Sequence, residues 1–374
     1  MDLGPENMPR AAARDVGRLD WLDAIRGYAI ILVVGIHAAA YSFIPLDSLG
    51  GWFGFLLSAA TVPLFFAADG FLISRRLDEG RPPRWRDVPR WAKRLLLPFL
   101  IFSLFYAGLR WIGESRGLLA EHLIPVNDPL ALLVTLYRTP HAQNLYFLPA
   151  LFLVRLAALP LIPLMRYGIG MRVALLLAAI GLNLAARATF LAPLLSAPVL
   201  DPVVYLFWGL PLFLSGLVLA RLAPLVAGRE AMVGAGALLL AALAQARGLG
   251  SLFIVYPYLA GLMALGRGLL SGDGRLARGF AFLGRRTMGI YLLHGPLFLK
   301  AGQMLVSKAG LVGWPGFFAL WGFGFAFGLA ATLAVERLRL DGLLFGAPTP
   351  RPRKGRHHSA ELAGDQSGPR CGEA

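Results

Sequence analysis

Long apolar runs separated by short charged segments recur along most of this 374-residue chain. The first clear run extends from Gly27 to Leu46 without a formally charged residue, which is enough for a helix to cross a bilayer core of roughly 30 Å. Only 15% of the residues are charged, whereas soluble proteins contain about 25%. The sequence therefore predicts an all-α polytopic membrane protein.

The spacing of the runs predicts about ten transmembrane helices. Arg155, His294 and the pair Asn183 and Arg187 interrupt three of the runs, so the boundaries of those helices are less sharply defined. The expected helices lie near residues 22–44, 51–73, 95–112, 143–164, 173–194, 203–220, 231–247, 252–269, 286–305 and 314–335.

The distribution of basic residues predicts the orientation. With a cytoplasmic N-terminus, most of the 36 lysine and arginine residues fall in cytoplasmic segments, as the positive-inside rule requires. An even number of helices then places both termini in the cytoplasm. The net charge of +15 does not indicate nucleic-acid binding, because the basic residues are spread over loops without a recognition module. Contact with anionic membrane lipid explains them more simply.

Three regions are expected. Residues 1–20 form a cytoplasmic N-terminal segment, residues 21–338 form the membrane domain, and residues 339–374 form a basic cytoplasmic tail that is expected to be disordered. Cys371 in the tail is the only cysteine, so neither a disulfide nor a thiolate metal site is expected. The first apolar run lacks a small-residue cleavage pattern, which predicts a retained helix and not a signal peptide.

Two ionisable residues share one face of the first predicted helix. Arg26 and His37 are eleven residues apart, which is three turns plus about 20° of rotation and roughly 16 Å of height. Ionisable groups at membrane depth usually serve a function. This predicts a site with a cation near the cytoplasmic edge and a base near the midplane. Alternatively, the arginine only reaches toward the headgroups and the histidine only bonds a neighbouring helix.

Asp69 lies near the cytoplasmic end of the second predicted helix. A carboxylate at that depth needs a cationic partner, because burial of an unpaired charge is costly. Arg26 on the preceding helix lies at a comparable depth and is one candidate. The alternative is an arginine at the interface: Arg75, Arg76 or Arg94.

Three further histidines lie between the first helix and the tail. His294, on the ninth predicted helix, is expected at a similar height to His37, so the two could line a common cavity; alternatively, His294 only orients a neighbour. His122 and His141 belong to the segment between the third and fourth helices. This is the largest predicted extracytoplasmic piece, and the one expected to shape a site for a bulky outer substrate.

The segment LDAIRGYAIILVVGIH, with its Arg-x10-His spacing, resembles the opening signature of the membrane acyltransferase 3 family. That signature has Leu-Asp-Gly-Leu-Arg-Gly followed by an apolar run and a histidine. Asp23, Arg26, Gly27 and His37 match it, whereas Ala24 replaces the usual glycine.

Four later segments also resemble this family. PLFFAADGFLIS is similar to Phe-Phe-x-x-Ser-Gly-Phe, with Asp69 where a serine is more usual, and RWAKRLLLP resembles the arginine-rich entry to the third helix. NLYFLPALF has Tyr146 in place of a tryptophan, and GRRTMGIYLLHGP carries Thr287 and His294 at a serine and a histidine position. The resemblance covers roughly residues 18–336 and is typical of the stand-alone form of the family.

The resemblance implies an acyl-CoA-dependent O-acyltransferase in a bacterial cytoplasmic membrane. An acyl group, most often acetyl, would pass from cytosolic acyl-CoA to a hydroxyl of a sugar, glycolipid or cell-envelope glycan. Acyl-CoA is then a donor substrate, and neither a bound cofactor nor a metal is expected.

The residues fit this chemistry, because transfer from a thioester to an alcohol needs a base that titrates near neutral pH. His37 is expected to be that base or to carry the acyl group transiently. Arg26 would hold an anionic part of CoA or the developing oxyanion, Asp23 would orient Arg26, and His294 would complete the cavity. The basic loop would attract the CoA phosphates through Arg75, Arg76 and Arg94.

Other functions stay open at this point. A transporter or flippase of a polar glycan or lipid could use His37 and Asp69 as proton-relay groups, although no inverted repeat is evident. A scaffold subunit without activity is a third reading. The acyl chain, the acceptor, the oligomeric state, a partner protein, and the choice between a one-step and an acyl-histidine mechanism are not decided by the sequence.

Overall fold

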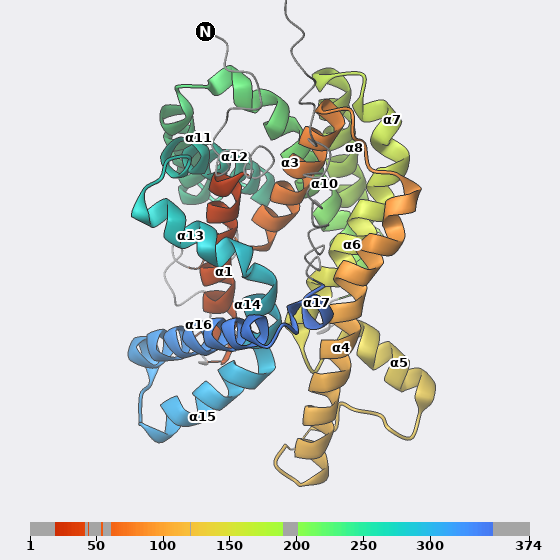
Figure 1. The fold of residues 1–374 in the computed structure, drawn as a ribbon, viewed down its shortest axis with the longest axis vertical. Coiled ribbons are helices and arrows are strands. Elements are labelled where there is room, and N and C mark those ends of the chain that lie inside the picture. Colours follow the sequence, from red (N-terminus) through yellow and green to blue (C-terminus); the bar gives the residue numbers. More distant parts are fainter. Residues whose placement is uncertain are drawn as a thin grey trace, which may run out of the picture.

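The computed structural model describes residues 19–41, 61–119, 121–189 and 201–346, together with the single residues 44 and 54. Within these ranges every regular element is helical (Figure 1). The longer helices are α1 (Asp20–Tyr41), α3 (Val62–Asp78), α4 (Val88–Ser115), α5 (Pro129–Arg138), α6 (Phe147–Ala158), α8 (Ile169–Ala188), α10 (Pro202–Leu222), α11 (Glu230–Ala246), α12 (Ser251–Leu270), α13 (Arg275–Arg285), α15 (Lys300–Lys308) and α16 (Gly313–Arg337). The shorter elements are η3 (Trp85–Asp87), η4 (Gln143–Tyr146), η5 (Leu159–Leu161), α7 (Ile162–Met165), η6 (Ala223–Val226), α14 (Thr287–Leu293), η7 (His294–Leu299) and α17 (Asp341–Leu344).

Seven helical segments of the described chain are long and apolar enough to cross a membrane, which confirms the predicted fold class. They are Asp20–Tyr41, Trp85–Ser115, Gln143–Met165, Ile169–Ala188, Pro202–Val226, Ser251–Leu270 and Gly313–Arg337. Two further predicted spans correspond to α3 and α11, which have 17 residues each. The count of ten therefore stays a prediction.

The ninth predicted helix, 286–305, is not continuous. The structure divides it into α14, the π-helical η7 and α15, and the backbone leaves helical geometry at Gly295, where ψ is −128°. Pro296 follows immediately; proline lacks an N–H and its ring collides with the preceding helical turn. The predicted span is therefore interrupted at this proline, and His294 lies directly before the break.

Some predictions fall outside the described residues. They concern the N-terminal segment up to residue 18, most of the first half of the 51–73 helix, the last residues of the 173–194 helix, and the tail from residue 347, including Cys371. The described start of the tail, before residue 347, contains the short helix α17.

Glycines bring the backbones of α1 and α13 into contact. A Cβ at Gly27 would overlap the carbonyl oxygen of Phe280, and a Cβ at Gly284 would overlap that of Asp23. Small residues allow such close approach between membrane helices. The turn of α1 that carries Asp23 and Arg26 is therefore held directly against the end of α13.

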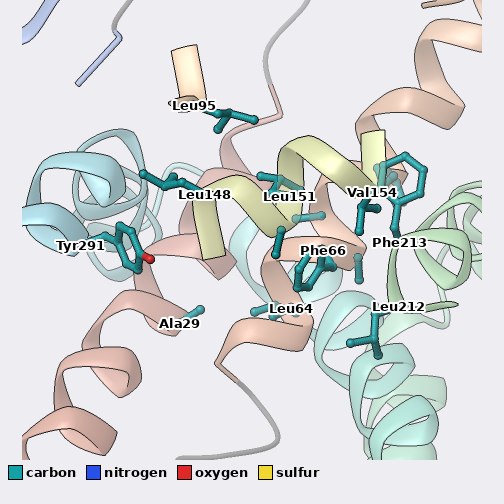
Figure 2. Close-up of a cluster of buried hydrophobic side chains, with 14 of the residues drawn as sticks. Ala29, Leu64, Phe66, Leu95, Leu148, Leu151, Val154, Leu212, Phe213 and Tyr291 are labelled. Carbon is teal, nitrogen blue, oxygen red and sulfur yellow. The ribbon is translucent and has the colours of Figure 1, made fainter. Parts of the chain in front are cut away.

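α3 and α10 form a second close pair at the centre of the bundle. Gly70 lies against the Phe213 carbonyl and Gly216 against the Ala67 carbonyl. Figure 2 shows the adjoining core, where Phe66 of α3 and Val154 of α6 lie beside Phe213. This core fixes α6 next to α3, which positions the polar residues described below.

Ion pairs join many helix termini at one end of the bundle, which we term the basic end. Asp78 at the end of α3 binds Arg172 of α8 at 2.9 Å and Arg221 of α10 at 3.7 Å. Arg285 of α13 lies 3.8 Å from Asp20 at the start of α1. The ends of α3, α10 and α13 and the starts of α1 and α8 therefore lie at this end, while the side of the membrane on which the basic end lies stays a prediction.

Helix α16 closes the bundle around the histidine region. In Figure 1 it crosses the direction of α1 at a large angle. Trp321 donates its indole N–H to the Ile31 carbonyl at 2.9 Å, and a Cβ at Gly328 would lie 3.3 Å from the Cβ of His294. At its far end, Glu336 accepts a 2.9 Å bond from Arg286. This bond joins α16 to the residue that precedes α14.

Candidate active site

A cavity of about 140 Å³ lies between α1, α3, α4, α6 and α14. Its apolar wall includes Val33, Leu95 and Leu148. Its polar lining consists of Arg26, Asp69, Arg94, Arg155, Thr287 and Tyr291. Five helices thus contribute side chains to one cavity that has both polar and apolar walls.

Arg26 enters the cavity from α1. Its Nη1 lies 3.5 Å from Oδ1 of Asp23, one turn earlier on the same helix. Asp23 itself is buried. The structure therefore brings together Asp23 and Arg26 as the sequence suggested, with the carboxylate in a position to orient the guanidinium.

Asp69 pairs with Arg155, which corrects the expectation of Arg26 or an interface arginine. The Arg155 Nε donates to Oδ2 of Asp69 at 2.7 Å, and its Nη2 donates to Oδ1. The Arg155 guanidinium also lies over the Trp91 ring, 5.7 Å from the ring centroid. Bidentate arginine–carboxylate bonds are strong and directional, so Asp69 is fixed to α6.

The arginines expected to attract CoA divide into two groups. Arg94 of α4 lines the cavity with Arg26. Arg75 lies outside it and donates to Glu79 at 2.8 Å, and Arg76 is not among the described lining residues either. Of the expected arginines, the structure brings Arg26 and Arg94 together.

The charges in the cavity favour an anionic ligand. Three guanidinium groups and one carboxylate are present among the described lining residues. Arg155 pairs with Asp69 and Arg26 pairs with Asp23, which leaves the positive charge of Arg94 in excess among these described groups. A partly desolvated site of this kind stabilises negative charge on a ligand or in a transition state.

His37 and His294 lie side by side. Their ring centroids are 5.3 Å apart with an angle of 44° between the ring planes. His294 is fully buried, and its Nδ1 lies 3.0 Å from the Ile290 carbonyl. Because a carbonyl only accepts, Nδ1 must carry the proton, so Nε2 is an acceptor. This Nε2 has no hydrogen-bond partner within the described residues.

The histidine pair continues the row of cavity residues along two helices. On α1, Arg26 and Val33 line the cavity, and His37 lies one turn beyond Val33. On α14, Thr287 and Tyr291 line it, and the Tyr291 ring centroid is 6.2 Å from that of His294. Along α1 and α14, the cavity thus lies between the arginine Arg26 and the two imidazoles.

A polar network that the sequence did not single out holds α14 in place. Tyr291 donates its hydroxyl to the Asn144 carbonyl, and the Asn144 amide donates to the Tyr291 carbonyl at 3.2 Å. Tyr106 of α4 donates to the Leu292 carbonyl at 2.7 Å. Arg155 was noted only as an interruption of its apolar run. An arginine within an apolar segment was itself a signal that Arg155 has an ionic partner, since intramembrane ionisable residues usually have one.

The two outer histidines do not belong to this cavity. His141 is buried and its Nε2 lies 3.0 Å from the Ser103 carbonyl of α4. His122 borders a separate shallow hollow with Trp111 and Asn127. Among the described residues, no group of three or more His, Cys, Asp or Glu side chains could hold a metal ion.

The family model of the acyltransferase domain matches residues 19–337, which include every residue of the cavity and both histidines. The chain belongs to the acyltransferase 3 family. No curated protein and no solved structure was found to match the chain. The seven apolar helices and the family together make this protein a multi-pass membrane acyltransferase.

Proposed function

We propose that this acyltransferase moves an acetyl group from acetyl-CoA to a hydroxyl of a sugar, glycolipid or cell-envelope glycan. The observation that carries the proposal is the His37–His294 pair beside a small arginine-lined cavity. Histidine supplies a base for the hydroxyl, and arginine supplies charge stabilisation for the carbonyl oxygen.

The histidine pair supports His37 as the base. His294 holds its proton toward Ile290, so its Nε2 is available to accept a hydrogen bond from His37. The other ring nitrogen of His37 would then take the proton of the acceptor hydroxyl. The hydroxyl oxygen bonds to the thioester carbon, the C–S bond breaks, and the CoA thiolate receives the proton from His37. In the alternative two-step route, His37 first carries the acyl group and the hydroxyl attacks it afterwards.

The arginines support the donor side of the reaction. Arg26, held by Asp23, would bind the thioester oxyanion or an anionic group of CoA, with Arg94 as a second cation. If the basic end is cytoplasmic, these arginines face the compartment that contains acyl-CoA, and Arg75 and Arg76 would add to the attraction of its phosphates.

The cavity volume favours a short acyl group. A cavity of about 150 Å³ accommodates a benzene-sized molecule, and the present cavity measures about 140 Å³. An acetyl group fits such a space, whereas a long acyl chain does not. We therefore infer acetyl-CoA as the donor.

A transporter that relays protons through His37 and Asp69 fits the geometry less well. Asp69 accepts two hydrogen bonds from Arg155, so a proton relay through this carboxylate would have to break both bonds.

The test is CoA release from acetyl-CoA by the purified chain in lipid nanodiscs. His37→Ala is expected to lower the rate of CoA release at least a hundredfold, because the base is lost. Arg26→Ala is expected to raise the acetyl-CoA concentration at which CoA release is half-maximal. His122→Ala, an exposed histidine outside the cavity, is the matched control and should behave as the parent chain.

Equal release by the parent and His37→Ala would remove His37 from the chemistry. Failure of acetyl-CoA to bind or to stabilise the protein would refute acetyl-CoA as the donor.

A further inference from the structure

A second cavity, of about 720 Å³, lies on the other side of α1. Ile25 and Tyr28 of α1 line it, whereas Arg26 and Val33 line the first cavity. Its volume falls within the roughly 300–1,000 Å³ typical of ligand sites. Helix α1 therefore separates a small polar cavity from a large apolar one.

The lining selects an apolar ligand. Apart from the hydroxyls of Tyr28 and Tyr258, the described side chains that line the cavity are hydrocarbon, drawn from α1, α11, α12 and α13. No charged residue is among them. Burying a polar group there without a partner would be costly, so the carbohydrate acceptor and the CoA nucleotide do not fit this space.

The walls of the cavity are closely packed. A Cβ at Gly234 of α11 would lie 2.7 Å from the backbone nitrogen of Leu265 in α12. Gly266 packs against the side chain of Ile25. Because these backbones touch, the space is bounded by helices that cannot move closer together and fill it.

The rim of the cavity lies where α12 ends and α13 begins. Leu269 and Leu276 line the cavity and are 64% and 67% exposed. Helix α13 is amphipathic: Ala277 is buried, whereas Arg275 and Arg278 are exposed. Exposed leucines beside arginines are typical of a helix at the boundary between headgroups and acyl chains.

Arg275 and Arg278, which neighbour the lining residues Leu276 and Ala277 in the sequence, are available to a ligand. No ion pair or side-chain hydrogen bond joins Arg275 or Arg278 to another described residue. In contrast, Arg267, one turn before Leu270, is already 3.7 Å from Glu230. An apolar cavity bounded by a helix that carries two such cations matches a lipid that has an acyl chain and an anionic headgroup.

We propose that this cavity binds one acyl chain of an anionic glycerophospholipid, whose phosphate is held by Arg275 and Arg278. The site is independent of the proposed acyl transfer. A bound lipid would fill the space behind α1 and support the helix that carries Arg26 and His37.

The test is lipid titration of the purified full-length chain in neutral detergent, followed by native mass spectrometry. Phosphatidylglycerol is expected to bind at least tenfold more tightly than phosphatidylcholine. Removing both charges with Arg275→Gln/Arg278→Gln should abolish this preference, since each arginine near a headgroup contributes about a fivefold factor. The matched control, Arg166→Gln/Arg229→Gln, removes two other exposed arginines and should retain it.

Two further experiments distinguish binding of the acyl chain in the cavity from binding of the phosphate by the arginines. Ala242→Phe, which fills the cavity from α11, should weaken phosphatidylglycerol binding. Glycerol phosphate, which has no acyl chain, should not compete with it. Equal binding of both lipids by the parent, unchanged binding in the double arginine variant, or competition by glycerol phosphate would each overturn the proposal.

Discussion

The ion pair between Asp69 and Arg155 determines how the cavity is lined. Both side chains are largely buried, with exposed fractions of 11% and 15%, and the pair joins α3 to α6. Removal of one partner from a buried pair leaves an uncompensated charge, whereas replacement of both by apolar residues of similar volume is often tolerated. Loss of either residue alone is thus expected to destabilise the protein, whereas replacement of both together is expected to be tolerated.

Asp69→Leu is expected to lower the free energy of unfolding by about 3 kcal/mol, because Arg155 stays charged and buried. The double variant Asp69→Leu/Arg155→Met should recover most of this loss. The measurement is unfolding of the purified protein in mixed micelles by a denaturing detergent. If the double variant is as unstable as the single one, the loss comes from packing and not from the unpaired charge.

At the scale of helices, the contact between α1 and α13 depends on Gly27 and Gly284. Their hydrogens occupy space in which a Cβ would overlap a backbone carbonyl. A backbone cannot move aside as a flexible side chain can, so a methyl group must push the helices apart. The first two turns of α1, with Asp23 and Arg26, would move with them.

Gly284→Ala is therefore expected to destabilise the protein by roughly 1–3 kcal/mol, as overpacking does, and to lower CoA release at least tenfold. Gly279→Ala, on the same helix, meets no atom within 4 Å and is the matched control. It should be neutral or slightly stabilising, since alanine favours helix over glycine. Thermal unfolding and the release assay check both variants, and equal behaviour of the two would contradict the close contact.

At the scale of the whole molecule, the ion-paired helix termini define a basic end. Positive charge of this kind marks the cytoplasmic face of membrane proteins. The loop between α12 and α13 belongs to this end, and the segment between α4 and α5 belongs to the opposite one. Orientation is therefore testable with one exposed residue from each.

In a Cys371→Ser background, Asp273→Cys is expected to resist a membrane-impermeant maleimide in intact cells, whereas Val126→Cys should react. Both positions are exposed in the structure. Disrupted cells provide the control, because both cysteines should react there. The reverse pattern would place the basic end outside and move the arginine-lined cavity away from cytosolic acyl-CoA.

The sequence by itself determined the features that depend on local order along the chain. Hydropathy predicted the apolar helices, since length and composition decide whether a helix can cross a bilayer. Helical periodicity placed Arg26 and His37 on one face, and the motifs within residues 18–336 indicated the family. The similar height of His37 and His294 was also predicted, because both helices were expected to enter from the same side.

Only the tertiary structure decided which segments meet. Asp69 pairs with Arg155, 86 positions away in the chain, because the core shared by α3, α6 and α10 packs α6 beside α3. The break at Gly295 and the network of Tyr291 and Asn144 set the position of His294. Such contacts depend on how whole helices pack and rotate against one another, and that information is spread over many side chains rather than held in any one motif.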